Sequence, residues 1–394
     1  MRHKDQILIT VSLSALVWAL RWVLLGLQPV WGDGHVYVAM AAGAEGSPPW
    51  SFHILTPRLA VLLSGRDPVA GFFGIAGLSF ILASAATVAM LGVGSLRMAP
   101  RERLLGAALF MAVYPGVAMF RAYFLVDSLS YALLAVACAA VVHRRDGLLA
   151  LVTLVGIFNR ETAFFVAPVW LFLNIGEVPP VRIAIRSARV FGPAVAAYIL
   201  LHHTPLFFGH YPAHLNYLRF DVMHALWKGN LSWLGTENII YGLGICVFLS
   251  YGPVWLLASY GYYQSLFVLR DGTRRLMLAL GTLALPTGLA LSVVDWRRGF
   301  QPLFPAVIVS SVLGLRAITC DLPKADWYLG AFGTVLAANF TTEAWWSVKI
   351  SVPVGISMSV WFCLIMFILL RKQFVIQCHC VTSAELGASE QRHS

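Results

Sequence analysis

Charged residues are scarce in this sequence. Only 12% of the 394 residues are Asp, Glu, Lys or Arg, whereas an ordinary soluble protein has about 25%. Hydrophobic residues make up 59% of the chain, and the mean hydropathy is +0.76. This composition excludes a water-soluble domain, a disordered chain and a nucleic-acid-binding protein. It predicts instead that lipid surrounds most of the chain.

Cysteine is also rare. Several of the six cysteines lie singly inside apolar runs, where a thiol behaves as a small hydrophobe. Only residues 378–380 (Cys-His-Cys) bring two of them close together, and this triplet lacks a second pair of ligands. We interpret it as a tail segment near the membrane or a palmitoylation site rather than a zinc site. The sequence therefore predicts neither a disulfide scaffold nor a metal site.

Several well-known catalytic motifs are missing. The sequence has no Walker A run, no His-Glu-x-x-His helix and no Gly-x-Ser-x-Gly turn. These motifs supply a phosphate cradle, two zinc ligands with a base, and an exposed serine nucleophile. Their absence leaves ATP-driven transport, zinc proteolysis and serine hydrolysis without support.

Long apolar runs are what the sequence has in abundance. A membrane-spanning helix needs about 20 apolar residues, and shorter helices can pair in a broken or re-entrant hairpin. We therefore predict an all-α integral membrane protein with about 12 transmembrane helices. They are expected near residues 7–29, 69–96, 104–120, 126–142, 147–158, 162–175, 190–206, 238–260, 276–294, 301–315, 327–341 and 349–370.

Basic residues predict the orientation in the membrane. The formal net charge is +10, and Lys and Arg concentrate in cytoplasmic loops. With the N-terminus inside, alternate loops hold most of the basic residues, so we expect both termini in the cytoplasm and the plasma (inner) membrane as the location. We expect one polytopic domain over 1–372, with outer loops at about 30–68 and 207–237. A cytoplasmic tail is expected over 373–394.

Four polar clusters fall on the outer side of this map. They contain Asp33 after the first span, Asp127 at the start of the fourth, residues 159–161 (Asn-Arg-Glu) and residues 295–298 (Asp-Trp-Arg-Arg). Ionisable groups at membrane depth are costly unless they are paired or wetted, so several at one level predict a shared polar cavity. Two alternatives stay open: Asp127 is also typical of a helix N-cap, and the arginines of 295–298 would also anchor a helix end among lipid headgroups.

The two long outer loops have different patterns. Residues 57–65 in the first loop could form an amphipathic helix lying at the membrane interface. The second loop is rich in aromatic residues and histidines without a compact metal spacing. We interpret its aromatics as a membrane-surface belt rather than a sugar-stacking or metal site.

The motifs 32–37 (Gly-Asp-Gly-His-Val-Tyr), 124–128 (Phe-Leu-Val-Asp-Ser) and 159–162 (Asn-Arg-Glu-Thr), together with the span layout, resemble the GT-C superfamily. Its members are multispanning glycosyltransferases that use polyprenyl-phosphate sugars on the outer face. The resemblance implies transfer of a hexosyl or pentosyl unit from such a donor to a lipid or glycan acceptor of the cell envelope. Because no large soluble domain follows the last predicted span, a smaller transferase is more similar than the oligosaccharyltransferase branch.

Sugar transfer from such a donor needs few protein groups. A sugar on a lipid phosphate already has a good leaving group, so the enzyme must deprotonate the acceptor hydroxyl and steady the departing phosphate. The resemblance implies that Asp33 is the general base, and we expect Asp127 and Glu161 to be catalytic with it. The expected substrate-binding residues are His35, Tyr37, Arg58, Arg121, Asn159, Arg160, Asp295, Arg297 and Arg298.

The expected partners are membrane lipid, the polyprenyl-phosphate sugar as co-substrate, and the glycan or lipid acceptor, with no nucleic acid. A divalent cation stays open as a cofactor. Two other classes of function also stay open. A secondary transporter or lipid flippase would also have many spans and intramembrane charges, although its two halves are usually related. A non-catalytic partner in envelope polymer assembly would share the same fold-level features.

Overall fold

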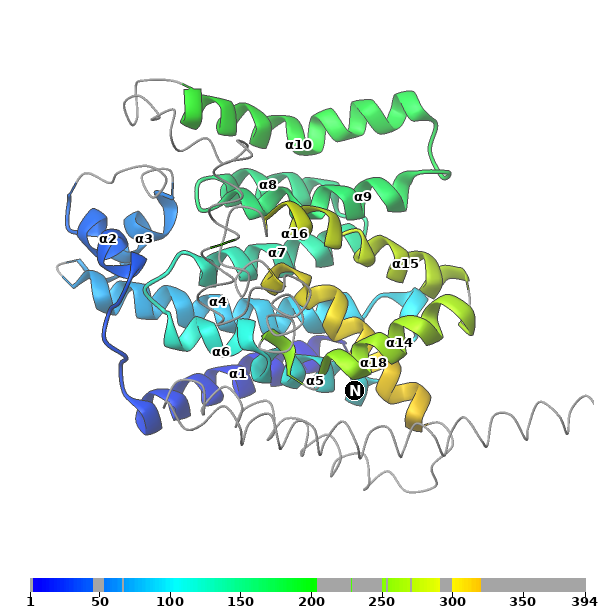
Figure 1. The fold of residues 1–394 in the computed structure, drawn as a ribbon, viewed down its shortest axis with the longest axis horizontal. Coiled ribbons are helices and arrows are strands. Elements are labelled where there is room, and N and C mark those ends of the chain that lie inside the picture. Colours follow the sequence, from blue (N-terminus) through cyan, green and yellow to red (C-terminus); the bar gives the residue numbers. More distant parts are fainter. Residues whose placement is uncertain are drawn as a thin grey trace, which may run out of the picture.

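The computed structural model describes residues 3–44, 53–65, 67–203, 228, 250–252, 254–269, 271–290 and 300–319. These residues form helices, turns and coil, with no strand among them (Figure 1). The α-helices are α1 (His3–Leu25), α2 (Asp33–Ala41), α3 (Leu55–Ser64), α4 (Pro68–Leu91), α5 (Pro100–Ala112), α6 (Tyr114–Arg121), α7 (Asp127–Val142), α8 (Asp146–Ile157), α9 (Ala167–Asn174), α10 (Pro180–His203), α14 (Val254–Phe267), α15 (Asp271–Gly281), α16 (Ala284–Ala290) and α18 (Phe304–Thr319). Short 3-10 helices are η2 (Gly94–Leu96), η3 (Glu161–Val166) and η5 (Gln301–Leu303). The predicted all-α fold is confirmed for this part of the chain.

Helix α4 lies in the middle of the bundle. It begins where the Asp67 carboxylate accepts hydrogen bonds from the backbone N–H groups of Val69 and Ala70, at 3.1 and 3.2 Å. Pro68 fills the first turn, where a missing N–H has no cost. The helix packs against α1, α3, α5, α6 and α7, and Figure 1 shows α1, α4, α7, α8 and α10 running side by side.

Helix α1 has its polar residues inside and its leucines outside. Its buried residues are Gln6, Thr10, Ser14, Trp18 and Arg21, which recur at helical spacing on one face. The opposite face exposes large apolar side chains, among them Leu8, Leu16, Leu20, Val23 and Leu24. A helix on the surface of a soluble protein has the reverse pattern. The outer surface of α1 therefore suits contact with lipid.

The number of spans differs from the prediction. Within the described residues, α1, α4 and α10 are long and apolar enough to cross a membrane, and the pair α5 and α6, bent by 49°, would make a fourth. Other predicted spans exist as helices that are too short: α8 has 12 residues, about 18 Å of helix at 1.5 Å per residue, against a hydrocarbon core of about 30 Å. For the described residues the prediction of about 12 spans is therefore wrong, because only three helices, or four with the bent pair, are long and apolar enough to cross a membrane. The predicted spans 327–341 and 349–370, most of 238–260 and the end of 276–294 lie outside the described residues.

The first long outer loop contains two helices, α2 and α3. The helix expected at 57–65 is present as α3, which begins two residues earlier and leaves Leu62 and Leu63 exposed. The predicted loop 207–237, apart from residue 228, and the predicted tail 373–394 lie outside the described residues.

Basic loops meet at one end of the bundle, which we call the basic end (around residues 94–102, 143–146, 174–180, 271–275 and 316). Arg316 donates to the Glu102 carboxylate at 2.6 and 2.9 Å. Glu177 pairs with Arg144 at 2.6 Å and with Arg275 at 2.8 Å. The hydrogen bond from Arg144, with the nearby charge of Arg275, holds the pKa of the Glu177 carboxyl below its usual range. Segments far apart in the sequence are thus joined by ion pairs.

Candidate functional site

Four segments meet at the opposite end of the bundle, which we call the polar end (residues 28–37, 53–56, 123–130 and 158–161). Figure 1 places α2 and α3 at this end and α15 at the other. The Tyr123 hydroxyl donates to the Gln28 carbonyl at 3.0 Å. The Leu55 N–H donates to the Phe158 carbonyl at 2.9 Å. Three of the four polar clusters predicted from the sequence therefore come together, whereas the fourth, with Asp295, Arg297 and Arg298, lies outside the described residues.

Asp127 and Arg160 form a largely buried ion pair. The Arg160 guanidinium contacts the Asp127 carboxylate, and the side chains are only 16% and 12% exposed. Asp127 is the first residue of α7, and the N-cap position is Val126, with no side-chain cap. The alternative that Asp127 is a helix N-cap is therefore not what the structure shows. Pairing offsets the large cost of removing two charges from water.

Asn159 holds the turn between α8 and η3 in place. It is fully buried, and its amide donates to the Val126 carbonyl at 2.9 Å and to the Ser130 hydroxyl at 2.8 Å. Its side-chain oxygen accepts a hydrogen bond from the Thr56 hydroxyl at 2.5 Å. Both amide hydrogens are used by protein acceptors, so this geometry suits positioning of the turn better than contact with a substrate.

A second chain of polar groups runs from Glu161 to α2. The Nε2 atom of His53 lies 3.7 Å from the Glu161 carboxylate. The Nδ1 atom of the same ring is 2.7 Å from the Tyr37 hydroxyl. His53 and Tyr37 are buried, whereas the Glu161 side chain is 44% exposed. Arg160 and Glu161 are therefore neighbours in sequence with different partners.

Asp33 begins α2, one helical turn before Tyr37 and on the same face. Its first turn lies against Phe124: a Cβ atom on Gly34 would come within 2.2 Å of the Phe124 ring, so only glycine allows this approach. The Trp31 ring also packs edge-on against Phe124, with centroids 5.3 Å apart. The half-buried Asp33 is thereby placed beside the segment that leads to Asp127.

The remaining predicted residues lie at the margin of this network. His35 on α2 and Arg58 on α3 are exposed, and their side chains lie outside the hydrogen-bonded network described above. Arg121 is partly buried in the last turn of α6.

Sequence reasoning missed His53, Thr56 and Ser130 as members of the site. Thr56 and Ser130 act on Asn159, which is 103 and 29 residues away in the chain. No local spacing reveals such a contact. The one usable signal is the position of His53 and Thr56 in the long first outer loop, which the charge pattern assigns to the same side as the acidic clusters.

The site has the groups for acid–base chemistry. Among the described residues, no three His, Cys, Asp or Glu side chains are grouped so that they could hold a metal ion. Carboxylates, a histidine and a guanidinium can accept a proton, donate hydrogen bonds and balance an anion.

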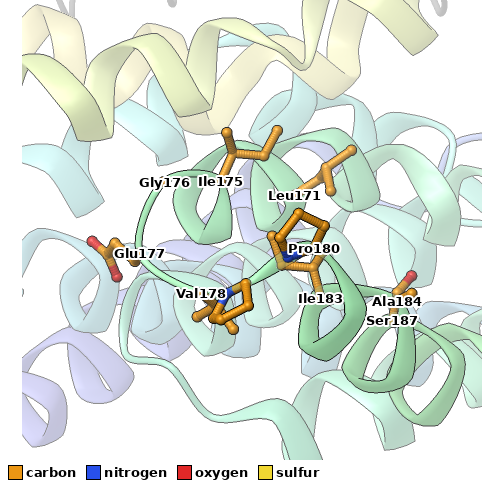
Figure 2. A pocket seen from close by; sticks show the side chains of 10 residues that line it. Leu171, Ile175, Gly176, Glu177, Val178, Pro180, Ile183, Ala184 and Ser187 are labelled. Atoms are coloured by element: carbon orange, nitrogen blue, oxygen red, sulfur yellow. The ribbon is translucent and has the colours of Figure 1, made fainter.

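A surface pocket lies elsewhere, between α9 and α10 at the basic end. It has a volume of about 790 Å³ and is lined mainly by apolar side chains, including Leu171, Ile175, Val178 and Ile183. Figure 2 shows the Glu177 carboxylate pointing away from these side chains. The pocket thus offers an apolar surface without the acid–base groups of the polar end.

Comparison of the sequence with family models and with curated proteins finds no match. The interpretation of the polar end therefore depends on its own geometry and on the motifs that it contains.

Proposed function

We propose that this protein is a membrane glycosyltransferase of the GT-C type. It would move a hexosyl or pentosyl unit from a polyprenyl-phosphate sugar to a lipid or glycan acceptor. The observation that carries the proposal is the convergence of the Asp33 turn, Asp127 and residues 159–161 at one end of the bundle. These are the three motifs on which the resemblance was based, and they come from segments that are distant in the sequence.

Asp33 is the proposed general base. The acceptor hydroxyl oxygen attacks the anomeric carbon, its proton passes to the Asp33 carboxylate, and the bond from that carbon to the phosphate oxygen breaks. The electron pair leaves with the polyprenyl phosphate, so the step needs no other reactant. Asp33 is half-buried rather than fully enclosed, which suits a base that must reach a substrate.

Glu161 and the Asp127–Arg160 pair have different proposed roles. The partly exposed Glu161 carboxylate can orient sugar or acceptor hydroxyls. Arg160 is held by Asp127 and supplies positive charge near the phosphate as negative charge develops on it. Asn159 holds the turn that carries Arg160 and Glu161 in place through its hydrogen bonds to Thr56 in α3 and Ser130 in α7.

The proposed orientation places the polar end outside and the basic end in the cytoplasm. Arginines from three separate segments, Arg144, Arg275 and Arg316, gather at the basic end, and basic residues are typical of cytoplasmic loops in membrane proteins. The site then lies on the outer face, in the plasma (inner) membrane, where lipid-linked sugars would meet envelope acceptors.

Turnover of a radiolabelled polyprenyl-phosphate sugar by the purified protein in nanodiscs tests the proposal. Asp33→Asn is expected to lower turnover by roughly two to four orders of magnitude, which is the usual effect of losing a positioned base. Asp271→Asn is the matched control, because Asp271 is fully exposed at the basic end and should leave turnover unchanged. Near-normal turnover in the Asp33 variant would overturn the assignment. Solute counterflow in liposomes without sugar transfer would instead support a transporter.

A further inference from the structure

We propose that His53 is a positioning residue that sets the place of Asp33 by joining α2 to Glu161. The inference depends on the proposed function for its kinetic consequence, whereas its structural consequence is independent of any substrate. The buried His53 ring contacts Tyr37 through one nitrogen and faces Glu161 with the other.

The segment that carries His53 is fixed to the 158–161 turn by other contacts. The Leu55 N–H donates to the Phe158 carbonyl at 2.9 Å, and the Thr56 hydroxyl donates to Asn159. His53 is therefore not needed to hold its own segment against the turn. Its added effect is the contact to the Tyr37 hydroxyl, which extends this hydrogen-bonded unit to α2.

The chemistry of the neighbours favours one tautomer of the ring. An ionised carboxylate only accepts hydrogen bonds, so the nitrogen facing Glu161 should carry the hydrogen. In a neutral ring the other nitrogen, Nδ1, is then an acceptor, and the Tyr37 hydroxyl donates to it. Glu161 thus orients His53, and His53 in turn fixes the side chain of Tyr37, which lies one helical turn after Asp33.

A displaced base lowers the rate of the chemical step more than it lowers donor binding, because misplacement by a fraction of the reacting distance costs rate steeply. His53→Gln and Tyr37→Phe should therefore lower kcat by at least tenfold and leave KM for the donor within about threefold. His143→Gln is the matched control, because His143 is exposed at the basic end and contacts the Ala89 carbonyl.

Chemical rescue separates loss of the ring from damage to the fold. His53→Gly leaves a buried space between Tyr37 and Glu161, and added imidazole should restore at least part of kcat. Absence of rescue, together with an unchanged kcat in Tyr37→Phe, would overturn the proposal. A loss of kcat in His143→Gln equal to that in His53→Gln would also overturn the proposal.

Hydrogen–deuterium exchange tests the structural part without a substrate. In His53→Gln and Tyr37→Phe, amides of α2 (Asp33–Ala41) should exchange faster than in the parent, while amides of α7 and α8 should not. Unchanged exchange in α2 refutes the positioning role even if the protein transfers sugar. Faster exchange in α2 in a protein that transfers no sugar would support the link to α2 and refute only the proposed function.

Discussion

The Asp127–Arg160 pair gives the sharpest test of the energetics at the polar end. Asp127→Ala would leave a guanidinium that is only 16% exposed without this carboxylate. Removing one partner of a buried ion pair usually costs about 3–5 kcal/mol, because the remaining charge stays desolvated. We therefore expect Asp127→Ala to lower the free energy of unfolding by about this amount.

The chain contains a matched control pair of the same residue types. Asp271 and Arg274 are 3.9 Å apart on α15, and their side chains are 103% and 52% exposed. Water screens such a pair and competes for both groups, so its loss should not be measurable. Comparing the two pairs removes the effect of side-chain identity and leaves burial and closeness of contact as the differences.

A double-mutant cycle isolates the interaction. Asp127→Ala, Arg160→Leu and the double variant would be unfolded reversibly in mixed micelles and followed by circular dichroism. Because the double variant leaves no orphaned charge, it should be less destabilised than the sum of the single variants by about 0.5–3 kcal/mol. A coupling energy no larger than that of the Asp271–Arg274 cycle would refute the reasoning.

Two further predictions concern other parts of the bundle. Arg21 donates to the Met111 and Gly116 carbonyls at the bend between α5 and α6, where Pro115 lacks the N–H that would otherwise bond Met111. Arg21→Lys should therefore lower the free energy of unfolding by about 1–3 kcal/mol, whereas Arg101→Lys, at an exposed position, should leave it unchanged. Equal melting temperatures of the two variants would contradict this. The lowered pKa of Glu177 means that its stabilising effect is complete above the unfolded pKa of about 4.3 and is lost as pH falls through the folded value. The difference in Tm between the parent and Glu177→Gln should therefore be present at neutral pH and vanish in acid; a difference that persists there would contradict the assignment.

Hydropathy predicts the positions of many helices well, but it counts as spans several helices that are too short to cross a membrane. The predicted spans at 69–96 and 126–142 correspond to α4 and α7. A hydropathy window counts apolar residues and does not detect breaks, so the run at 104–120 did not reveal the 49° bend between α5 and α6. The predicted spans 147–158 and 162–175 are themselves short, and the structure has them as short helices.

Charge alternation predicted that Asp33, Asp127 and residues 159–161 share one end, and the structure brings these segments together. It could not predict which residue pairs with which. The partners of Arg160 and Glu161 are set by how α7 and the first outer loop pack beside the 159–161 turn, over separations of 33 residues and more. The local sequence does not predict contacts between segments so far apart.

Helix α1 buries polar side chains and exposes leucines, and this pattern affects how a loss of turnover in variants of the polar end should be interpreted. In lipid, leucine gains nothing by leaving the solvent, so the helices of a membrane bundle associate through close packing and hydrogen bonds. The buried Thr10 and Ser14 hydroxyls bond to carbonyls of their own helix, and Arg21 bonds across to the bend between α5 and α6. At the polar end, Asn159 and the Asp127–Arg160 pair join helices in the same way. The same polar contacts therefore hold the bundle and shape the proposed site, so a loss of turnover assigns a catalytic role only where the free energy of unfolding is unchanged.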